Sequence, residues 1–503
     1  MIAISREISF STIEAALQGP IRIELDAPAA GAIEKGQQAL IEILRNQQTV
    51  YGINTGFGLL AEKRISSQDL NQLQINLVLS HACGIGTPLE PRIVRLVLLL
   101  KIKSLSIGYS GVRLELVQRL AALLNADALP EIPSQGSVGA SGDLAPLAHL
   151  ASALIGEGFI WIGGKRLTAA AALNQIGLSP FALGPKEGIA LLNGTQVSTA
   201  LALAGLCDAR RVFSAAIVAG AMSVDAAMGT DAPFDPRIHH VRPYLGQQRC
   251  AALLRRLLTG SQIRESHRGC ARVQDPYSLR CQPQVMGAVW DQMAYAARQL
   301  LCEANSVTDN PLLFPDTGDS LSGGNFHAQP VAFAADALAV AICEIGSLSE
   351  RRIALLIDRH LSQLPPFLVE HGGLHSGFMI PQVAAAALVS ENKSLAYPSS
   401  VDSLPTSANQ EDHVSMATYA ARRTIEMARN AGAVVAIELL AAAQGIDFRR
   451  PLLTSPPLQA ALQRIRSEVP FYDKDRFFSP DIERIRQLVA TGAWEDIAEV
   501  PWT

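Results

Sequence analysis

Charge and aromatic side chains are both scarce in this sequence. Charged residues make up 17% of the 503 positions and aromatic residues 5%, whereas about 25% of the residues in a typical soluble domain are charged. So few charges cover the surface of a large monomer poorly, and we therefore expect subunits to bury part of that surface against one another. The hydrophobic share of 49% is rich in Ala and Leu, which favour closely packed helices.

A basic excess, a leader-like segment and a membrane span are not evident either. The net charge is −4 and the pI is near 6.2, which leaves no basic surface for nucleic acid or an anionic membrane. The first residues show no basic stretch before a long apolar run, and the apolar stretch 431–443 is interrupted by Glu438. We therefore expect neither a secretory signal nor a membrane-spanning helix.

Paired cysteines are also lacking. The seven cysteines are scattered, none belongs to a C-x-x-C pair, and their number is odd. This pattern argues against a disulfide framework. We therefore expect a reducing compartment, the cytoplasm.

Helical periodicity runs through most of the chain, and the helical segments lengthen after about residue 186. Before that point, patterns over 93–105 and 112–125 alternate with loops rich in glycine and proline. Beyond it, Ala-rich segments typical of a buried bundle are predicted over 189–219, 285–304, 330–357, 379–395 and 414–443. Shorter, more charged helices follow Pro456, and no βαβ alternation or internal repeat is present. We therefore predict a mainly α protein with an N-terminal domain of helices and loops (1–195) and a long-helix bundle (196–503).

The most specific signal is the string GSVGASGDLAPLAH at residues 136–149. It predicts a glycine-rich loop leading into a helix, with Asp143 at the N-cap and Pro146 in the first turn. Because Gly142 has no Cβ, its backbone nitrogen can approach the carbonyl carbon of Ala140.

Other glycine-rich catalytic loops fit the sequence poorly. A hydrolase elbow needs G-x-S-x-G, but Asp143 stands where the last glycine would be. A phosphate-binding loop needs Lys followed by Ser or Thr after its glycines, and this pair is lacking here. Residues 56–61 match a dinucleotide fingerprint only loosely, because no strand precedes them.

Five further polar motifs accompany this string along the chain. They are YGINTGFG at 51–58, LLNGTQ at 191–196, VQDPYSLRCQPQ at 273–284, SGGNFH at 322–327 and SANQEDHVSM at 407–416. Together, and in this order, they make nearly the whole chain resemble the aromatic amino acid ammonia-lyase family. Members of that family cyclise and dehydrate an Ala-Ser-Gly tripeptide into 4-methylidene-imidazol-5-one.

The resemblance implies a fumarase-like helical bundle in which Ala140, Ser141 and Gly142 form this electrophile, with Ser141 supplying the methylene carbon. It implies that no metal or nucleotide is required. It also implies a homotetramer whose active sites draw on three subunits, in agreement with the low charge. The reaction would eliminate ammonia from an aromatic L-amino acid, and we expect L-histidine as the substrate and trans-urocanate as the product.

The resemblance also assigns roles to residues of the other motifs, with Tyr51 as the base that removes the β-proton. The expected catalytic residues are Ala140, Ser141, Gly142, Tyr51, Tyr277 and Glu411. The expected substrate-binding residues are His81, Asn193, Arg280, Phe326 and Gln274.

Several of these side chains also have a purely structural interpretation. Tyr51 and Phe326 would then be packing aromatics, and Arg280 would form a surface ion pair. Asn193, which we expect inside a helix, would satisfy neighbouring backbone groups. Residues 409–413 suggest a metal site as an alternative, although they lack the i, i+4 helical ligand spacing.

Two histidines outside this set, His149 and His327, are expected to be structural.

Two other functions remain open. A phenylalanine or tyrosine ammonia-lyase, or an aminomutase, would use the same scaffold, but a purely apolar substrate ring leaves Ser80, His81 and Glu411 without polar partners. His81 has one donor and one acceptor when neutral, which suits an imidazole; structurally, it would close the turn that ends at Gly84. An inactive helical scaffold would keep the fold but lack the near-UV absorbance of the cyclised tripeptide.

Overall fold

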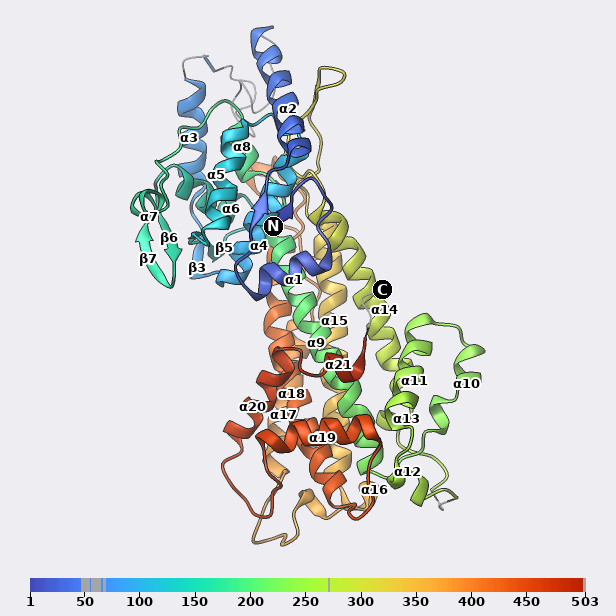
Figure 1. Cartoon of the computed structure of the whole chain (residues 1–503). Helices are drawn as coiled ribbons and strands as arrows, with labels where there is room; N and C mark the ends of the chain where they lie inside the picture. The colour runs from blue at the N-terminus through green and yellow to red at the C-terminus, as the bar shows by residue number, and fades with distance from the viewer. Residues whose placement is uncertain (47–54, 56–64, 67–68, 270–271, 501–503) are drawn as a thin grey trace. The chain divides into compact units, whose positions relative to one another are not determined.

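The computed structural model describes residues 1–46, 55, 65–66, 69–269 and 272–500 (Figure 1). The expected base Tyr51 and the segment 56–61 lie outside the described residues. Helices dominate the described part of the chain, and its strands are at most four residues long. The prediction of a mainly α protein is confirmed.

The chain divides into two compact units, each assembled from separate stretches. The first comprises Met1–Ala204, Ala297–Asp336 and Pro398–Arg422, and the second comprises Gly205–Ala296, Ala337–Tyr397 and Arg423–Thr503. Long helices that contribute residues to both units are α9 (Gln196–Ala226), α14 (Gln282–Ala304), α15 (Gln329–Ile357) and α18 (Ala417–Asp447). The expected domain boundary between residues 195 and 196 remains a prediction.

The first unit contains a deeply buried helix, α4 (Pro91–Ser106), in which every residue from Ile93 onward is buried. Its partners are α1 (Phe10–Gln18), α2 (Ala27–Arg45) and α5 (Leu114–Asn125). A second group packs α6 (Leu144–Leu154) against α3 (Leu70–His81), α7 (Ala169–Gln175) and α8 (Glu187–Leu192).

The strands of the first unit form small sheets. β1 (Ile2–Ala3) and β2 (Ile23–Glu24) are parallel. The antiparallel pairings join β3 (Ile85–Pro88) to β5 (Pro133–Gln135), β6 (Phe159–Ile162) to both β4 (Leu129–Pro130) and β7 (Lys165–Thr168), and β8 (Leu312–Phe314) to β9 (Asp319–Leu321).

The second unit is built on long helices that a buried carboxylate links. Glu438 of α18 accepts hydrogen bonds from Ser223 of α9 and from Ser349 and Arg352 of α15. The remaining helices of this unit are α10 (Pro236–His240), α11 (Leu245–Leu258), α12 (Gln262–Ser266), α13 (Tyr277–Arg280), α16 (Arg359–Ser362), α17 (Met379–Leu395), α19 (Pro456–Glu468), α20 (Ser479–Ala490) and α21 (Glu495–Ala498). By length and composition alone α15 could cross a membrane, but 67% of its most apolar window is buried inside the protein, as in a core helix.

Most of the predicted helices are confirmed to within a few residues, but the helix predicted over 189–219 is wrong as a single element. The structure breaks it in two: α8 ends at Leu192, and α9 begins at Gln196. Asn193 is extended, with φ −80° and ψ 132°, and Gly194 has φ +130°, a conformation that favours glycine. Asn193 therefore lies in a break between two helices, and the prediction that it lies inside a helix is wrong.

Candidate active site

The Ala140-Ser141-Gly142 turn lies in the first unit, between β5 and the start of α6. Gly142 has φ +75°, and a Cβ at this position would lie 2.2 Å from the carbonyl oxygen of Gly194. The two glycines form a β-bridge, and the Asp143 nitrogen donates to the Gly194 oxygen over 2.7 Å. Only glycine permits this close approach of two backbone segments.

The broken helix supplies an amide to this turn. Asn193 Nδ2 donates to the carbonyl oxygen of Ser141 over 2.7 Å. Asn193 is only 3% exposed, and its Oδ1 is buried with no hydrogen-bond partner among the described residues. A buried acceptor without a partner is costly, and it can therefore receive a donor from a ligand.

A loop far along the chain supplies a carboxylate to the same turn. Ser141 Oγ donates to Glu411 Oε1 over 2.5 Å. The other oxygen of Glu411 accepts from Thr406 Oγ1 at 2.6 Å and from Ser407 Oγ at 3.1 Å. The serine hydroxyl and carbonyl are thus contacted by Glu411 and Asn193, respectively.

Asp143 occupies the N-cap position of α6, but its side chain does not cap that helix. Its carboxylate is fully buried and accepts from the backbone nitrogen of Ser198, at 2.7 Å, in the first turn of α9. It also accepts from the hydroxyl groups of Ser198, Thr418 and Ser137. The prediction that Asp143 caps α6 is therefore correct for its position but wrong for its side chain, which links the turn to α9 and to α18.

Two histidines lie near the turn that follows α3: His81 is the last residue of α3, and His149 belongs to α6. His81 Nδ1 lies 2.8 Å from the carbonyl oxygen of Leu77; because a carbonyl only accepts, Nδ1 carries the proton, and Nε2 of the neutral ring is an acceptor. His149 Nε2 accepts from the backbone nitrogen of Gly84 over 3.1 Å, and burial lowers the pKa of its imidazole. His149 thus stabilises the turn that follows His81.

The loop that carries Phe326 approaches the turn through its backbone. The nitrogen of Ala328 donates to the Gly139 oxygen over 3.2 Å, and Phe326 is half-buried. The imidazole of His327 stacks on that of His413 with ring centroids 5.7 Å apart. No group of three or more metal-ligating side chains occurs among the described residues, so the metal alternative for residues 409–413 gains no support.

The remaining expected residues, Tyr277, Arg280 and Gln274, belong to the second unit. The guanidinium carbon of Arg280 lies 4.7 Å from the centroid of the Tyr277 ring, and Tyr277 is 70% exposed. Gln274 is also exposed.

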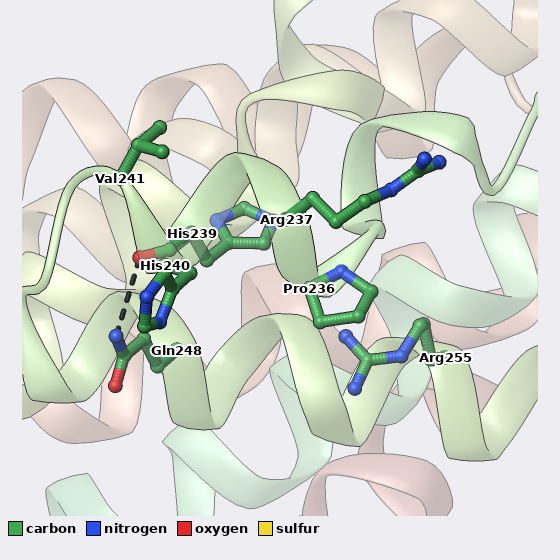
Figure 2. Close-up of a pocket in the computed structure, with 7 residues that line it drawn as sticks. All are labelled: Pro236, Arg237, His239, His240, Val241, Gln248 and Arg255. Atoms are coloured by element: carbon green, nitrogen blue, oxygen red, sulfur yellow. Dashed lines mark hydrogen bonds between the residues drawn. The ribbon is translucent and has the colours of Figure 1, made fainter.

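A cavity of about 590 Å³ in the second unit contains none of the expected residues. Figure 2 shows it between α10 and α11, with the amide of Gln248 bonded to the carbonyl oxygen of His239. The two arginines that line the cavity already have partners: Arg237 forms an ion pair with Asp235, and Arg255 donates to the carbonyl oxygen of Phe234. The cavity therefore does not compete with the Ser141 turn as a candidate site.

Two of the residues that support the turn, Thr418 and Lys101, are not predicted from the sequence. Threonine is common at the start of a helix, so the sequence around Thr418 does not indicate its hydrogen bond to Asp143. Lys101, whose ammonium contacts the Asn193 backbone, is more conspicuous, because it directly follows the apolar run 96–100.

The mainly helical fold holds an Ala-Ser-Gly turn between a carboxylate and an amide. Residues 8–467 match the aromatic amino acid lyase family, and the chain belongs to that family, a class of carbon–nitrogen lyases. It is 60% identical to histidine ammonia-lyase from Aromatoleum aromaticum over 473 residues, which cover 94% of this chain and 90% of that one.

Solved structures show the same fold. Histidine ammonia-lyase from Trypanosoma cruzi matches with a TM-score of 0.92 at 41% identity, covering 100% of this chain and 96% of that one. Tyrosine aminomutase from Streptomyces globisporus matches with a TM-score of 0.93 at 33% identity, covering 99% and 98%.

Proposed function

We propose that this enzyme eliminates ammonia from L-histidine to give trans-urocanate, in histidine catabolism in the cytoplasm. The observation that carries the proposal is the enclosure of Ser141, whose hydroxyl donates to Glu411 and whose carbonyl accepts from Asn193. Relatives named histidine ammonia-lyase match nearly the whole chain, which supports histidine as the substrate.

The turn would generate its own prosthetic group, 4-methylidene-imidazol-5-one. In ring closure the Gly142 nitrogen bonds to the Ala140 carbonyl carbon and one water leaves; a second water takes the hydroxyl of Ser141 and its α-hydrogen. As the α-hydrogen departs, negative charge develops on the Ser141 carbonyl oxygen, where Asn193 Nδ2 already donates. The donors and acceptors around the turn therefore fit the group, which would supply an electrophilic carbon that makes the substrate amine a better leaving group.

The chain's own residues would bind and deprotonate the substrate. Tyr51 would remove the β-proton, and Phe326 would pack against the electrophile. Glu411 loses its Ser141 partner on dehydration and then becomes available to the substrate. His81 Nε2, an acceptor in the neutral ring, would accept from the substrate imidazole. An apolar ring would leave this nitrogen unpaired, at a cost of about 1–3 kcal/mol if it is buried.

A neighbouring subunit of a homotetramer would supply the residues for the carboxylate. Arg280 offers a planar fork that matches a carboxylate in two hydrogen bonds, and Tyr277 and Gln274 would lie beside it. The exposure of Tyr277 within one chain agrees with a side chain that meets its ligand only after assembly.

The test compares the wild type with Ser141→Ala. We expect the wild type to form urocanate and ammonia from L-histidine and to show near-UV absorbance from the dehydrated tripeptide. Ser141→Ala has no hydroxyl to lose, so it should fold, lack the absorbance and lose at least about 10³-fold in kcat. Urocanate formation is followed spectrophotometrically, and circular dichroism checks the fold.

The same assay separates the rival functions when L-phenylalanine and L-tyrosine are added in parallel. A preference for either of them would refute the histidine assignment, and accumulation of a β-amino acid would identify an aminomutase. A wild type with no absorbance and no ammonia release would leave only an inactive scaffold.

A further inference from the structure

Helix α4 carries a lysine whose ammonium group reaches the break between α8 and α9. Lys101 is 1% exposed, and its Nζ donates to the carbonyl oxygens of Asn193, at 2.9 Å, and Ala190, at 3.2 Å. These are carbonyls at the C-terminal end of α8, where the helix leaves acceptors without internal partners. Lys101 therefore fixes the backbone of the residue whose side chain contacts Ser141.

The burial of this ammonium is unfavourable by itself. Burial lowers the pKa of Lys101 to about 7, although the carboxylates of Asp309 and Asp143 oppose this shift and the nearby Lys186 reinforces it. Asp309 is itself paired with Lys186 over 2.9 Å, so Lys101 has no bonded carboxylate among the described residues. A buried cation without a bonded carboxylate is expensive, which points to a role for the groups that it contacts.

Those groups form a short chain of contacts that leads to the electrophile-forming turn. The Asn193 carbonyl accepts from Lys101, while the Asn193 side chain donates to the Ser141 oxygen. The next residue, Gly194, accepts from the Asp143 nitrogen over 2.7 Å. A shift of the Asn193 carbonyl would therefore move both groups that this segment places against the turn.

We propose that Lys101 is a positioning residue, which fixes the Asn193–Gly194 segment so that the Ala140-Ser141-Gly142 turn cyclises and dehydrates. The proposal rests on the function proposed above for that turn. Lys101 itself touches neither Ser141 nor the substrate in this scheme. It acts through the backbone of Asn193, and its loss should affect kcat and formation of the prosthetic group more than KM.

The same helix offers a matched control. Lys103 is also a buried lysine, 6% exposed, and its Nζ donates to the backbone carbonyls of Ile4, Ser5 and Arg6. Burial lowers its pKa as well. It differs from Lys101 in contacting the N-terminal segment and not the Asn193 break.

The experiment compares Lys101→Met, Lys101→Arg and Lys103→Met in the full-length enzyme. We expect both Met variants to lose thermal stability, but only Lys101→Met to lose the near-UV absorbance and the mass decrease that dehydration of the tripeptide causes. Its kcat should fall at least about tenfold with KM within about threefold, since small misplacements at a site are costly. Lys101→Arg keeps a donor to the same carbonyls and should restore most of the absorbance.

Several outcomes overturn the proposal. Wild-type absorbance and kcat in Lys101→Met would do so, and so would equal losses in Lys103→Met. If Lys101→Met does not fold, Lys101→Gln replaces it; its shorter, uncharged side chain should leave less of the tripeptide dehydrated, and a wild-type extent of dehydration would reject the role. A wild type without absorbance or ammonia release would instead refute the proposed function of the turn.

Discussion

Two buried carboxylates, one in each unit, are satisfied in different ways. Asp143 in the first unit and Glu438 in the second are both fully buried, and each accepts from more than one hydroxyl group. Glu438 also accepts two hydrogen bonds from the guanidinium of Arg352, one of them 2.7 Å long. Among the described residues, Asp143 has no bonded cation, and its remaining partners are the hydroxyl and backbone nitrogen of Ser198.

The difference follows from where each carboxylate lies. Glu438 is in the middle of α18, and its partners are Ser223 in the last turn of α9 and two residues within α15. The ion pair therefore links helices to one another. Asp143 directly follows the Ser141 turn, and its partners are at the first turns of α9 and α18. The carboxylate of Glu438 thus serves the packing of helices, whereas that of Asp143 holds the turn against two helix starts.

Among the buried carboxylates and their partners, replacement of Asp143 should have the largest effect on function. In Asp143→Ala the buried Ser198 nitrogen and the Ser137 hydroxyl lose their acceptor. The hydroxyl groups of Ser198 and Thr418 each keep a second acceptor. The cost is about 1–3 kcal/mol for each group left unsatisfied. With the turn unfixed, near-UV absorbance should be largely lost and kcat should fall about 10²-fold. Absorbance per mole and turnover of L-histidine are measured on the folded fraction. Ser198→Ala, which keeps the backbone donor, is the mild control, and wild-type absorbance in Asp143→Ala would show that this carboxylate does not fix the turn.

Replacement of Arg352 should affect stability but not the chemistry. Arg352→Met leaves Glu438 buried without its cation, which typically costs about 3–5 kcal/mol. Chemical denaturation measures the loss, and the folded variant should keep wild-type absorbance. Adding Glu438→Leu should recover most of the stability, because an apolar pair needs no desolvation of charge. A loss of absorbance in the folded single variant would mean that the two carboxylates do not differ as described.

The smallest predicted effect is a pH-dependent change in stability when a third buried carboxylate, Asp225 in the second unit, is replaced. Burial raises the pKa of its carboxyl to about 6, although hydrogen bonds from Thr454 and Ser261 lower it. The folded state therefore binds this proton more tightly than the unfolded state, and stability from this group is lost as pH rises from about 4 to about 6. Asp225→Asn does not titrate, so its stability relative to the wild type should rise over this range, by at most about 3 kcal/mol. Chemical denaturation of both proteins at about pH 4, 5 and 6 measures this change in relative stability. If the difference in free energy of unfolding between the two proteins does not change with pH, the raised pKa of Asp225 is contradicted.

Local sequence predicted the helices well where a single period continued without interruption. The segment 379–395 coincides with α17, and α4, α14 and α15 agree to within a few residues. The prediction failed at Asn193, where apolar stretches on both sides favoured one continuous helix. The polar residues 193–196 interrupt them, and their Asn-Gly pair is a local turn signal that the helical period outweighed. Hydrophobic periodicity indicates which face of a helix is buried. It does not indicate a break that residues distant in sequence, Lys101 and Gly142, stabilise through contacts with Asn193 and Gly194.

The sequence by itself determined the helical class, the glycine-rich turn at Ala140-Ser141-Gly142 and the residue types that the chemistry needs. Only the tertiary structure decided which of them meet. Ser141 contacts Glu411 across 270 residues, Asp143 contacts Thr418 across 275, and Lys101 contacts Asn193 across 92. Such pairs depend on how helices pack, and no local sequence pattern predicts them. The same Asp, Glu, Ser or Lys occurs in a sequence whether its side chain faces water or contacts a buried turn.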